Sequence, residues 1–451
     1  MHLHFIGIGG IGMSGLAKIF LELGYTVSGS DTKETQITKH LHHKGAIIYK
    51  GHKKNQIYGA DLVIFSSAIK NSNPEIRQAK KRKVPLIARG KLVAQIINPK
   101  KSIIVAGTHG KTTTTALIAE LLLNTGKDPS IFMGGILKKI GSNSRLGKSS
   151  YVVVESDESD ASFLHFHPDI AVVTNVEDDH LDFYGSSRNI VYAFIKFMHQ
   201  VKPQGTGALN LDDAASSFIF KKVKREKILT YGLNKQADIR AEDIKLQVFQ
   251  SSFKVYYKKN YMGELTVPLP GMHNVYNSLA ATATGYLLGI SWTEIKNSLC
   301  SFEGVKRRIE KVGEIGQVPV FDDYAHHPTE IKAVLGELKK VGRRTIVIFQ
   351  PHRYSRTKLL LSKFLTAFDK ADILILTPIY PAGERPISGI NGKVLFEALQ
   401  KRRSLPTYYI PSRERIIQFV QANLRENDLV VTLGAGDITE LSLQLIPGEQ
   451  R

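Results

Sequence analysis

The chain has 451 residues, which favours about three domains of roughly 150 residues each over a single core. Its 42% hydrophobic and 23% charged residues are typical of a soluble globular protein, and its single cysteine and lack of any signal-peptide or membrane-length apolar run predict a cytoplasmic protein without membrane insertion. The net charge of +20 comes from short basic clusters without interleaved aromatic residues, so we expect no nucleic-acid partner and interpret the charge as a solvated surface that attracts anionic small substrates.

The first hundred residues alternate between strand-like and helix-like patterns. An apolar strand at 3–6 runs into a glycine-rich turn at 7–12, and apolar residues then recur at helical spacing as far as Gly24. Further strands are expected at 25–28, 46–49, 61–65 and 84–88. This alternation predicts a parallel α/β domain that ends near residue 98 in an Asn-Pro-Lys-Lys linker.

The glycine-rich turn has the spacing Gly7-x-Gly9-x-x-Gly12, with Asp31 nineteen residues beyond the last glycine. This pattern is typical of dinucleotide binding, in which the glycines permit a close pyrophosphate and the acid bonds a ribose hydroxyl. The diphosphate of a UDP-sugar would use the same helix N-terminus. The motif alone therefore leaves three alternatives open: an NAD site, a UDP-sugar site, and a glycine-rich turn that binds no ligand.

Two further units follow in the chain. The second opens with a strand at 102–106, continues with strands at 151–155 and 169–174, and closes near Gly304, a possible hinge. The third alternates again, and its strands are expected at 318–321, 344–349, 371–376 and 429–433. Both units therefore also belong to the α/β class.

The strand at 102–106 leads into "AGTHGKTTTTALIAEL", a shortened phosphate-binding loop. The leading glycine of the usual G-x-x-x-x-G-K-[ST] pattern is displaced, but Gly107 and Gly110 still allow backbone amides to face phosphate oxygens. Lys111 can neutralise the β/γ-phosphate charge and the Thr112 hydroxyl can ligate magnesium. A purely structural turn would not require a lysine followed by a hydroxyl, so we predict a nucleotide site.

A phosphate-binding loop needs an acid to complete its metal site. Glu155 ends the strand "YVVVE", where the carboxyl edge of a parallel sheet would face the loop. His180 lies among carboxylates just past the strand at 169–174, which makes it a better ligand candidate than an isolated histidine. We rank Glu155 above His180 as the metal-binding side chain.

Seven blocks of sequence together resemble the Mur ligase family: "GTHGKTTTT", "VVVESDESDASF", "TNVEDDHLDFYG", "PGMHNVYNSLAA", "FDDYAHHPTEI", "FQPHRYSRT" and "PAGERPISG". These blocks lie in the second and third proposed domains, and the resemblance as a whole covers all three domains in order. The resemblance implies an α/β fold with an N-terminal Rossmann-like UDP-binding domain at 1–98, a central P-loop ATPase-like domain with a mostly parallel sheet at 99–304, and a C-terminal Rossmann-like domain at 305–451.

The resemblance also implies a set of site residues. ATP would contact Gly107, Thr108, His109, Gly110, Lys111, Thr112, Thr113, Asn274, Asn277, Arg308 and Asp323. The UDP-sugar would contact Gly9, Gly10, Gly12, Ser30, Asp31, Ser66 and Ser67, and the amino acid His326, Arg353 and Arg356. Lys111, Glu155 and His180 would be catalytic, and Mg²⁺ would be held by Thr112, Glu155 and His180.

The activity implied by the resemblance is ATP-dependent ligation of L-alanine to UDP-N-acetylmuramate through an acyl phosphate, in peptidoglycan precursor synthesis. The nearest alternative is a recycling ligase that attaches a tripeptide to the same acceptor, although "FQPHRYSRT" favours the alanine reaction. An NAD-dependent oxidoreductase would leave Lys111, Thr112 and Glu155 unused. A nucleic-acid-stimulated ATPase would not explain two further α/β domains. The sequence leaves the oligomeric state open.

Overall fold

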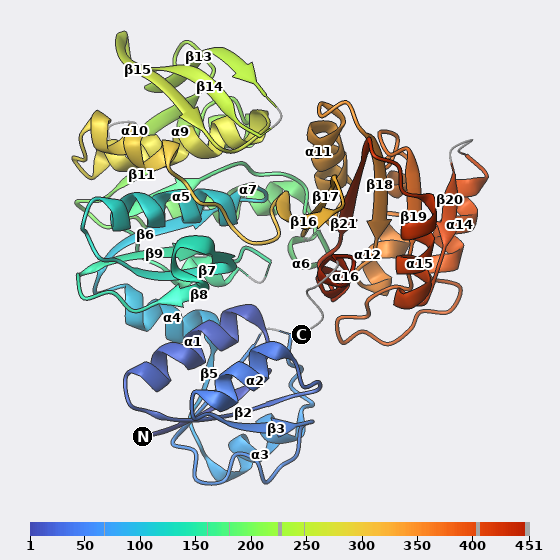
Figure 1. Ribbon diagram of the computed structural model, residues 1–451. Helices are drawn as coiled ribbons and strands as arrows, with labels where there is room; N and C mark the ends of the chain where they lie inside the picture. The colour runs from blue at the N-terminus through green and yellow to red at the C-terminus, as the bar shows by residue number, and fades with distance from the viewer. Residues whose placement is uncertain are drawn as a thin grey trace. The chain divides into compact units, whose positions relative to one another are not determined.

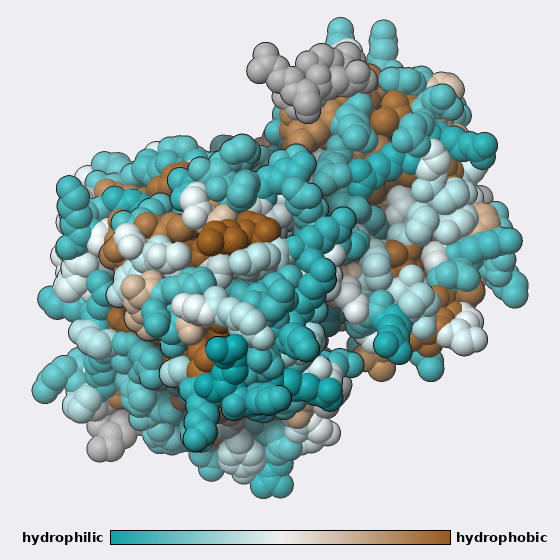
Figure 2. All heavy atoms as spheres, turned by 90° about the horizontal axis from the view of Figure 1, so that it is seen from below, coloured by the Kyte–Doolittle hydropathy of each residue, from teal (hydrophilic) through white to brown (hydrophobic). Residues whose placement is uncertain are grey.

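The computed structural model describes most of the chain, namely residues 1–66, 68–159, 161–179, 181–223, 228–247, 249–402 and 406–446. The chain divides into two compact units, one formed by Met1–Leu246 with Gln250–Val305 and the other by Gln247–Phe249 with Lys306–Arg451. Within the described residues, no helix has the length and apolar character needed to cross a membrane. The face drawn in Figure 2 is largely hydrophilic, with apolar side chains in small separate areas.

The first unit begins with a five-stranded parallel sheet in the order β3-β2-β1-β4-β5 (Figure 1). Its elements are β1 His2–Ile6, α1 Ile11–Glu22, β2 Thr26–Asp31, α2 Gln36–His43, β3 Ile47–Lys50, β4 Leu62–Phe65, α3 Pro74–Arg82, β5 Leu86–Ala88 and α4 Arg89–Ile97. All five predicted strands are present, which confirms the α/β class of this region.

The predicted end of the second strand was wrong. We expected the strand to stop at Ser28, just before Gly29-Ser30-Asp31, yet β2 continues through Asp31. Gly29 pairs with both Phe5 of β1 and Ile48 of β3, so the tertiary pairing of a central strand outweighs the local preference. The three extra residues carry Ser30 and Asp31 to the carboxyl edge of the sheet.

The same unit contains a ten-stranded sheet in the order β15-β14-β13-β12-β11-β10-β6-β9-β7-β8. Its elements are β6 Lys101–Ala106, α5 Lys111–Asn124, β7 Ser130–Leu137, β8 Ser142–Arg145, β9 Tyr151–Glu155, β10 Ile170–Val173, α6 Leu181–Tyr184, α7 Ser187–His199, β11 Thr206–Asn210, α8 Ala214–Lys222, β12 Ile228–Gly232, β13 Ile239–Leu246, β14 Ser251–Tyr257, β15 Asn260–Val267, α9 Met272–Leu287 and α10 Trp292–Cys300. The middle of the sheet is parallel, whereas β13, β14 and β15 at one edge, and β7 with β8 at the other, pair antiparallel.

Two apolar clusters cover the faces of the ten-stranded sheet. One is built around α5 and α9, and residues 116–119 of α5 are fully buried in it. The other contains Phe194 of α7 and continues through Leu92 of α4 to Phe5 of the five-stranded sheet. This continuous apolar packing explains why the first two sheets form one compact unit.

The second unit has a six-stranded sheet in the order β16-β17-β21-β18-β19-β20, parallel except for the pair β16–β17. Its elements are β16 Glu310–Ile315, β17 Val318–Asp323, α11 Pro328–Lys339, β18 Arg344–Phe349, α12 Tyr354–Leu359, α13 Leu361–Phe364, β19 Ile373–Leu376, α14 Gly392–Gln400, β20 Thr407–Tyr409, α15 Arg413–Asn423, β21 Asp428–Leu433 and α16 Ile438–Gln444. The four predicted strands are its four central strands. One cluster packs α11, α13 and α14 on one side of them, and another packs α15 and α16.

Candidate active site

The phosphate-binding loop connects the end of β6 to the start of α5, as the sequence predicted. Gly107 and Gly110 have φ angles of +139° and +79°, which side-chain-bearing residues rarely adopt. A Cβ atom on Gly107 would overlap the hydroxyl of Thr174, and one on Gly110 would overlap the amide oxygen of Asn277. Glycine is therefore required at both positions for two independent reasons.

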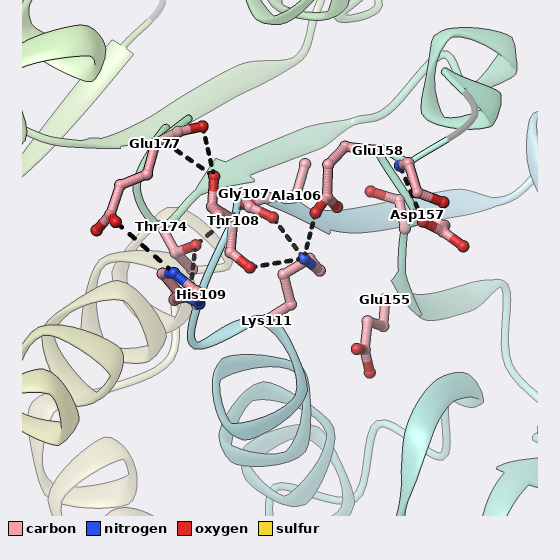
Figure 3. A network of polar contacts seen from close by, with 12 residues as sticks. Ala106, Gly107, Thr108, His109, Lys111, Glu155, Asp157, Glu158, Thr174 and Glu177 are labelled. Carbon is pink, nitrogen blue, oxygen red and sulfur yellow. Dashed lines mark hydrogen bonds and ion pairs between the residues drawn. The ribbon is translucent and has the colours of Figure 1, made fainter. Parts of the chain in front are cut away.

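The loop is held by the residues that follow β10, the strand next to β6 in the sheet. The amide of Thr108 donates to the Asn175 carbonyl at 3.0 Å, and the amide of His109 donates to the Asn175 side-chain oxygen at 2.9 Å. The Thr174 hydroxyl donates to the carbonyl of His109 at 2.7 Å (Figure 3). These bonds fix the loop backbone before any ligand arrives, which is the preorganisation that phosphate binding requires.

Lys111 is directed back over the loop (Figure 3). Its ammonium donates to the carbonyls of Gly107 and Thr108 at 2.6 and 3.0 Å and to Oε1 of Glu158 at 2.8 Å. Burial alone would lower the pKa of Lys111, but Glu158, with help from Glu155, outweighs burial and raises it. The side chain therefore remains a charged ammonium at the loop.

Glu155 lies at the end of β9, and Figure 3 shows its carboxylate apart from that of Glu158. Its Oε1 accepts a hydrogen bond of 2.7 Å from the Thr112 hydroxyl, and its Oε2 accepts one of 2.5 Å from the amide of Gly134. Hydroxyl and carboxylate oxygens are the hard donors that Mg²⁺ prefers, so this pair fits the ion. His180, the third predicted ligand, lies outside the described residues. Within those residues, no cluster of three or more His, Cys, Asp or Glu side chains is arranged for a metal.

Two asparagines of α9 lie close to the loop. Asn277 accepts a hydrogen bond of 3.1 Å from the Thr114 hydroxyl of α5 and donates one of 3.0 Å to the side chain of Asn274. Asn274 in turn donates to the carbonyl of Pro270 at 2.7 Å. These two predicted ATP contacts therefore lie on one face of α9 beside the loop. Thr113 follows Thr112 in the first turn of α5.

The first glycine turn connects β1 to α1 and is held by the end of β2. The Ser30 carbonyl accepts hydrogen bonds from the amides of Gly7 and Ile8 at 2.8 and 3.1 Å. The Asp31 carboxylate accepts one of 2.9 Å from the amide of Gly9. Asp31 therefore shapes the turn itself, a role that the sequence did not indicate.

The remaining predicted residues of this turn lie around it. Gly10 caps the start of α1 with φ −65°, an ordinary extended conformation. The guanidinium of Arg89 occupies the place where a Cβ atom of Gly12 would be. A Cβ atom on Gly7 would lie 3.7 Å from Cβ of Ser66, beyond the end of β4. Ser67 lies outside the described residues.

Asp323 ends β17 in the second unit and is fully buried. Its two oxygens accept hydrogen bonds of 2.7 Å from the amides of Ile309 and Ala325. Burial raises the pKa of this carboxyl to about 6, although Arg308 opposes the shift. The guanidinium carbon of Arg308 lies 5.8 Å from the centre of the ring of Tyr324, the residue that follows Asp323. The two predicted ATP contacts Arg308 and Asp323 are therefore close to each other in the second unit.

A second cluster in this unit joins residues after β17 and β18. Arg356 Nη1 lies 2.9 Å from Nδ1 of His352. Because a guanidinium only donates, this ring nitrogen must accept, so His352 is neutral. Burial lowers the pKa of His352 to about 3 and that of His326 to about 4, and the two ring centres are 5.7 Å apart. Arg353 is the residue just before α12 and has φ +69°, and its amide donates to the carbonyl of Tyr380.

Three domain profiles match successive parts of the chain. Residues 2–101 match "Mur ligase family, catalytic domain", residues 105–285 "Mur ligase middle domain", and residues 307–436 "Mur ligase, glutamate ligase domain". The chain belongs to the Mur ligase family.

Individual relatives extend this match over nearly the whole chain. The UDP-N-acetylmuramate–L-alanine ligase of Syntrophus aciditrophicus is 43% identical over 99% of this chain and 93% of its own length. The protein of the same name from Aquifex aeolicus is 44% identical over 97% of this chain and 95% of its own length. The crystal structure of UDP-N-acetylmuramate-alanine ligase from Thermotoga maritima is 31% identical and has a TM-score of 0.86 over 99% of this chain and 98% of that one.

A murein peptide ligase from Psychrobacter arcticus is also similar in structure. It is 26% identical, with a TM-score of 0.74 over 99% of this chain and 98% of that one. The matches across all three parts of this Mur ligase confirm the predicted fold class. They also disfavour an NAD-dependent oxidoreductase or a nucleic-acid-stimulated ATPase, neither of which accounts for all three. The boundaries at 98/99 and 304/305 remain predictions.

Sequence reasoning missed several residues that shape the sites of this Mur ligase. Glu158 lies in the acidic stretch 156–160, for which the sequence left open a solvated turn or a further metal contact, yet it is the carboxylate that pairs with Lys111. Asn175 comes directly after a predicted strand, and this position was the only sequence signal that its side chain could hydrogen-bond to the loop. Arg89 and Tyr380 approach their sites from distant parts of the sequence, and no local pattern indicated them.

Proposed function

We propose that this Mur ligase joins the amino group of L-alanine to the carboxylate of UDP-N-acetylmuramate and converts ATP to ADP and phosphate. The observation that carries the proposal is the near-complete match to proteins with this activity in their names, at 43% and 44% identity. The ordered ATP loop supports it independently. The reaction would serve peptidoglycan precursor synthesis in the cytoplasm.

The ATP loop supplies what activation of a carboxylate requires. A carboxylate cannot lose oxide, so the γ-phosphoryl group is first transferred to it, giving an acyl phosphate and ADP. Lys111 and the loop amides would stabilise charge on the transferring phosphoryl group. A bound Mg²⁺ would neutralise further phosphate charge, and Thr112 and Glu155 would hold it. Alanine's amine then attacks the acyl carbon, and phosphate leaves.

The other two substrates are assigned to the remaining sites. The turn at 7–12 would bind the diphosphate of UDP-N-acetylmuramate, because the first amides of α1 point out of that helix end. His326, Arg353 and Arg356 would surround alanine. A guanidinium binds a carboxylate through two parallel hydrogen bonds, which matters because the alanine methyl group contributes only about 1–3 kcal/mol of discrimination.

The decisive experiment measures ADP release from the purified protein with UDP-N-acetylmuramate and each amino acid in turn. We expect release with L-alanine and little with larger side chains. Heavy oxygen placed in the acceptor carboxylate should appear in the released phosphate, because the attacking oxygen leaves with phosphorus. Label retained only in the amide product would contradict an acyl phosphate.

The recycling reaction is tested in the same assay by replacing alanine with the intact tripeptide. The similarity to the murein peptide ligase motivates this arm, although its identity and TM-score are lower than those of the alanine-ligase structure.

An Arg356→Lys variant should raise the KM for alanine far more than that for ATP. Equal effects on all substrates would show that the alanine carboxylate is held elsewhere.

A further inference from the structure

A continuous chain of polar contacts runs through the N-terminal sheet beside the first glycine turn. Nδ1 of His2 lies 2.9 Å from the Gly59 carbonyl, and its Nε2 lies 2.7 Å from the Ser28 hydroxyl. That hydroxyl also lies 2.7 Å from Nδ1 of His4, whose Nε2 lies 2.8 Å from Oε2 of Glu75. His4, Ser28 and Glu75 are all fully buried.

The number of protons in this chain of contacts follows from the identity of its ends. The Gly59 carbonyl can only accept, so Nδ1 of His2 must donate to it. At the other end an ionised Glu75 also only accepts, so Nε2 of His4 must donate. The two central contacts, on either side of Ser28, need one proton each. Four protons are required in all.

The neutral side chains cannot supply four protons. Neutral His2 and neutral His4 carry one ring proton each, and the Ser28 hydroxyl carries one, which makes three. With Glu75 ionised, as its lowered pKa indicates, the fourth proton must lie on a ring nitrogen, and it converts one of the two histidines to an imidazolium. The hydroxyl can point to either ring, so the same count holds whichever histidine is charged.

Glu75 is the counter-charge of this proton. Burial alone would raise the pKa of its carboxyl, but hydrogen bonds from His4, His52 and Ser30 outweigh burial and hold the pKa below its usual value. Nδ1 of His52 lies 2.9 Å from Oε1, and the Ser30 hydroxyl donates to Oε2 at 2.8 Å. A buried carboxylate paired with one imidazolium is neutral overall, which lowers the cost of burying both charges.

The pair is connected to the glycine turn through Ser30. The Ser30 side chain is held by Glu75, while its carbonyl accepts the amides of Gly7 and Ile8. A change in the charge of Glu75 or of its partners therefore acts on the residue that sets the turn.

We propose that His2, Ser28, His4 and Glu75 hold one extra proton at neutral pH and act as positioning residues for the first glycine turn. The functional half of this proposal rests on the proposed binding of UDP-N-acetylmuramate to that turn.

Other titratable groups also face this cluster. His52 contacts Glu75 on the side opposite His4, and the Tyr49 ring lies 6.3 Å from the His4 ring. The Asp61 carboxylate accepts the backbone amide of His2. A pH titration therefore needs variants that separate the two histidines from these neighbours.

The proton is tested by NMR on the full-length protein labelled with heavy nitrogen in histidine. The two nitrogens of an imidazolium have similar chemical shifts, whereas a neutral ring gives two well-separated ones. We expect one imidazolium pattern from the buried pair at about pH 8, where free histidine is neutral. His2→Gln and His4→Gln assign the signals, and His43→Gln, on the exposed end of α2, is the matched control.

Ser28→Ala provides the critical variant. Without the hydroxyl, only the two outer contacts remain, and two neutral histidines satisfy them. The imidazolium pattern should disappear at about pH 8 while the His43 signals stay unchanged. Two neutral rings in the parent protein, or an unchanged imidazolium in Ser28→Ala, would overturn the assignment of the fourth proton to a histidine.

The positioning role is tested by calorimetric binding to Glu75→Gln and Ser28→Ala. We expect roughly tenfold weaker binding of UDP-N-acetylmuramate to Glu75→Gln, a smaller loss for Ser28→Ala, and unchanged binding of ATP to both. Unchanged binding of the UDP-sugar to a folded Glu75→Gln protein would overturn the positioning role. If Glu75→Gln does not fold, the binding of UDP-N-acetylmuramate to Ser28→Ala tests the positioning role, and unchanged binding to that variant would overturn it. Failure of the parent protein to bind the UDP-sugar would instead contradict the proposed function and leave the NMR result standing.

Discussion

The two glycine turns of the first unit have the same local construction and different partners. Each follows a parallel strand, β1 or β6, and precedes a helix, α1 or α5. Each is also held by the end of a neighbouring strand, β2 in the first case and β10 in the second. The first is held by the carbonyl of Ser30 and the carboxylate of Asp31, whereas the second is held by Thr174 and Asn175.

The difference lies in the charge that each turn presents. The first turn gives one amide to Asp31, a negative group suited to hydroxyls of a nucleotide sugar. The second holds the Lys111 ammonium over its own carbonyls, a positive group suited to transferring phosphate. The two turns thus share a glycine-rich backbone and differ in the charge of the side chain held at it, Asp31 in the first and Lys111 in the second.

The largest expected effect is on turnover, from Lys111→Ala. Loss of this charge should lower ADP release by at least about a hundredfold, the usual scale for one preorganised group at a phosphoryl site. Calorimetric binding of UDP-N-acetylmuramate should remain normal, because the first turn is untouched. Lys259→Ala, in the turn between β14 and β15, is the control. Near-normal turnover of Lys111→Ala would remove the second turn from the mechanism.

The next largest effect is on stability, and it arises from a difference between the two helices that follow the turns. Helix α5 buries the carboxylate of Glu120, whereas α1 buries no acidic side chain. Burial raises the pKa of Glu120 to about 7, although Lys139, 3.9 Å away, opposes the shift. The folded protein therefore binds the proton more tightly, and stability falls as the pH rises from the ordinary carboxyl value near 4.5 to about 7.

Glu120→Gln should abolish this pH dependence. Relative to the parent, its free energy of unfolding should rise by up to about 3 kcal/mol between about pH 5 and about pH 8. Urea unfolding at both pH values measures the difference. Parallel pH profiles for parent and variant would show that Glu120 titrates normally.

A smaller effect is expected at the first turn from Asp31→Ala. Removing the acceptor of the Gly9 amide should raise the KM for UDP-N-acetylmuramate about tenfold, since a hydrogen bond to a charged group contributes about 1.5–3 kcal/mol. The KM for ATP should not change. An increase in both constants would mean that Asp31 supports the whole unit instead of one turn.

The smallest effect compares glycines at matching positions before the two helices. Gly10→Ala should change the free energy of unfolding by less than about 0.5 kcal/mol, because φ is −65° and a Cβ would meet only ordinary contacts. Gly110→Ala should cost clearly more, since φ is +79° and the Cβ would overlap Asn277. Thermal unfolding of both variants measures this contrast, and equal losses would contradict it.

Strands were predictable where a buried parallel strand has an uninterrupted apolar run, as in β6, β9 and β18. They were not predictable where polar and apolar residues alternate, and no strand was predicted for β13, β14 or β15. In β14, Phe253 and Val255 are buried while the intervening residues are not, a period of two that any surface strand shares. The end of β2 was missed because Gly29 favours a turn until two neighbouring strands pair with it.

The sequence by itself determined the two glycine turns, the lysine and hydroxyl that start α5, and the carboxylate that ends β9, because each depends on residues adjacent along the chain. Only the tertiary structure decided that Asn175 holds the ATP loop, that Glu158 pairs with Lys111, and that His4 meets Glu75. The physical reason is that a hydrogen bond depends on atoms within about 3 Å, and folding brings together side chains that are far apart in the sequence.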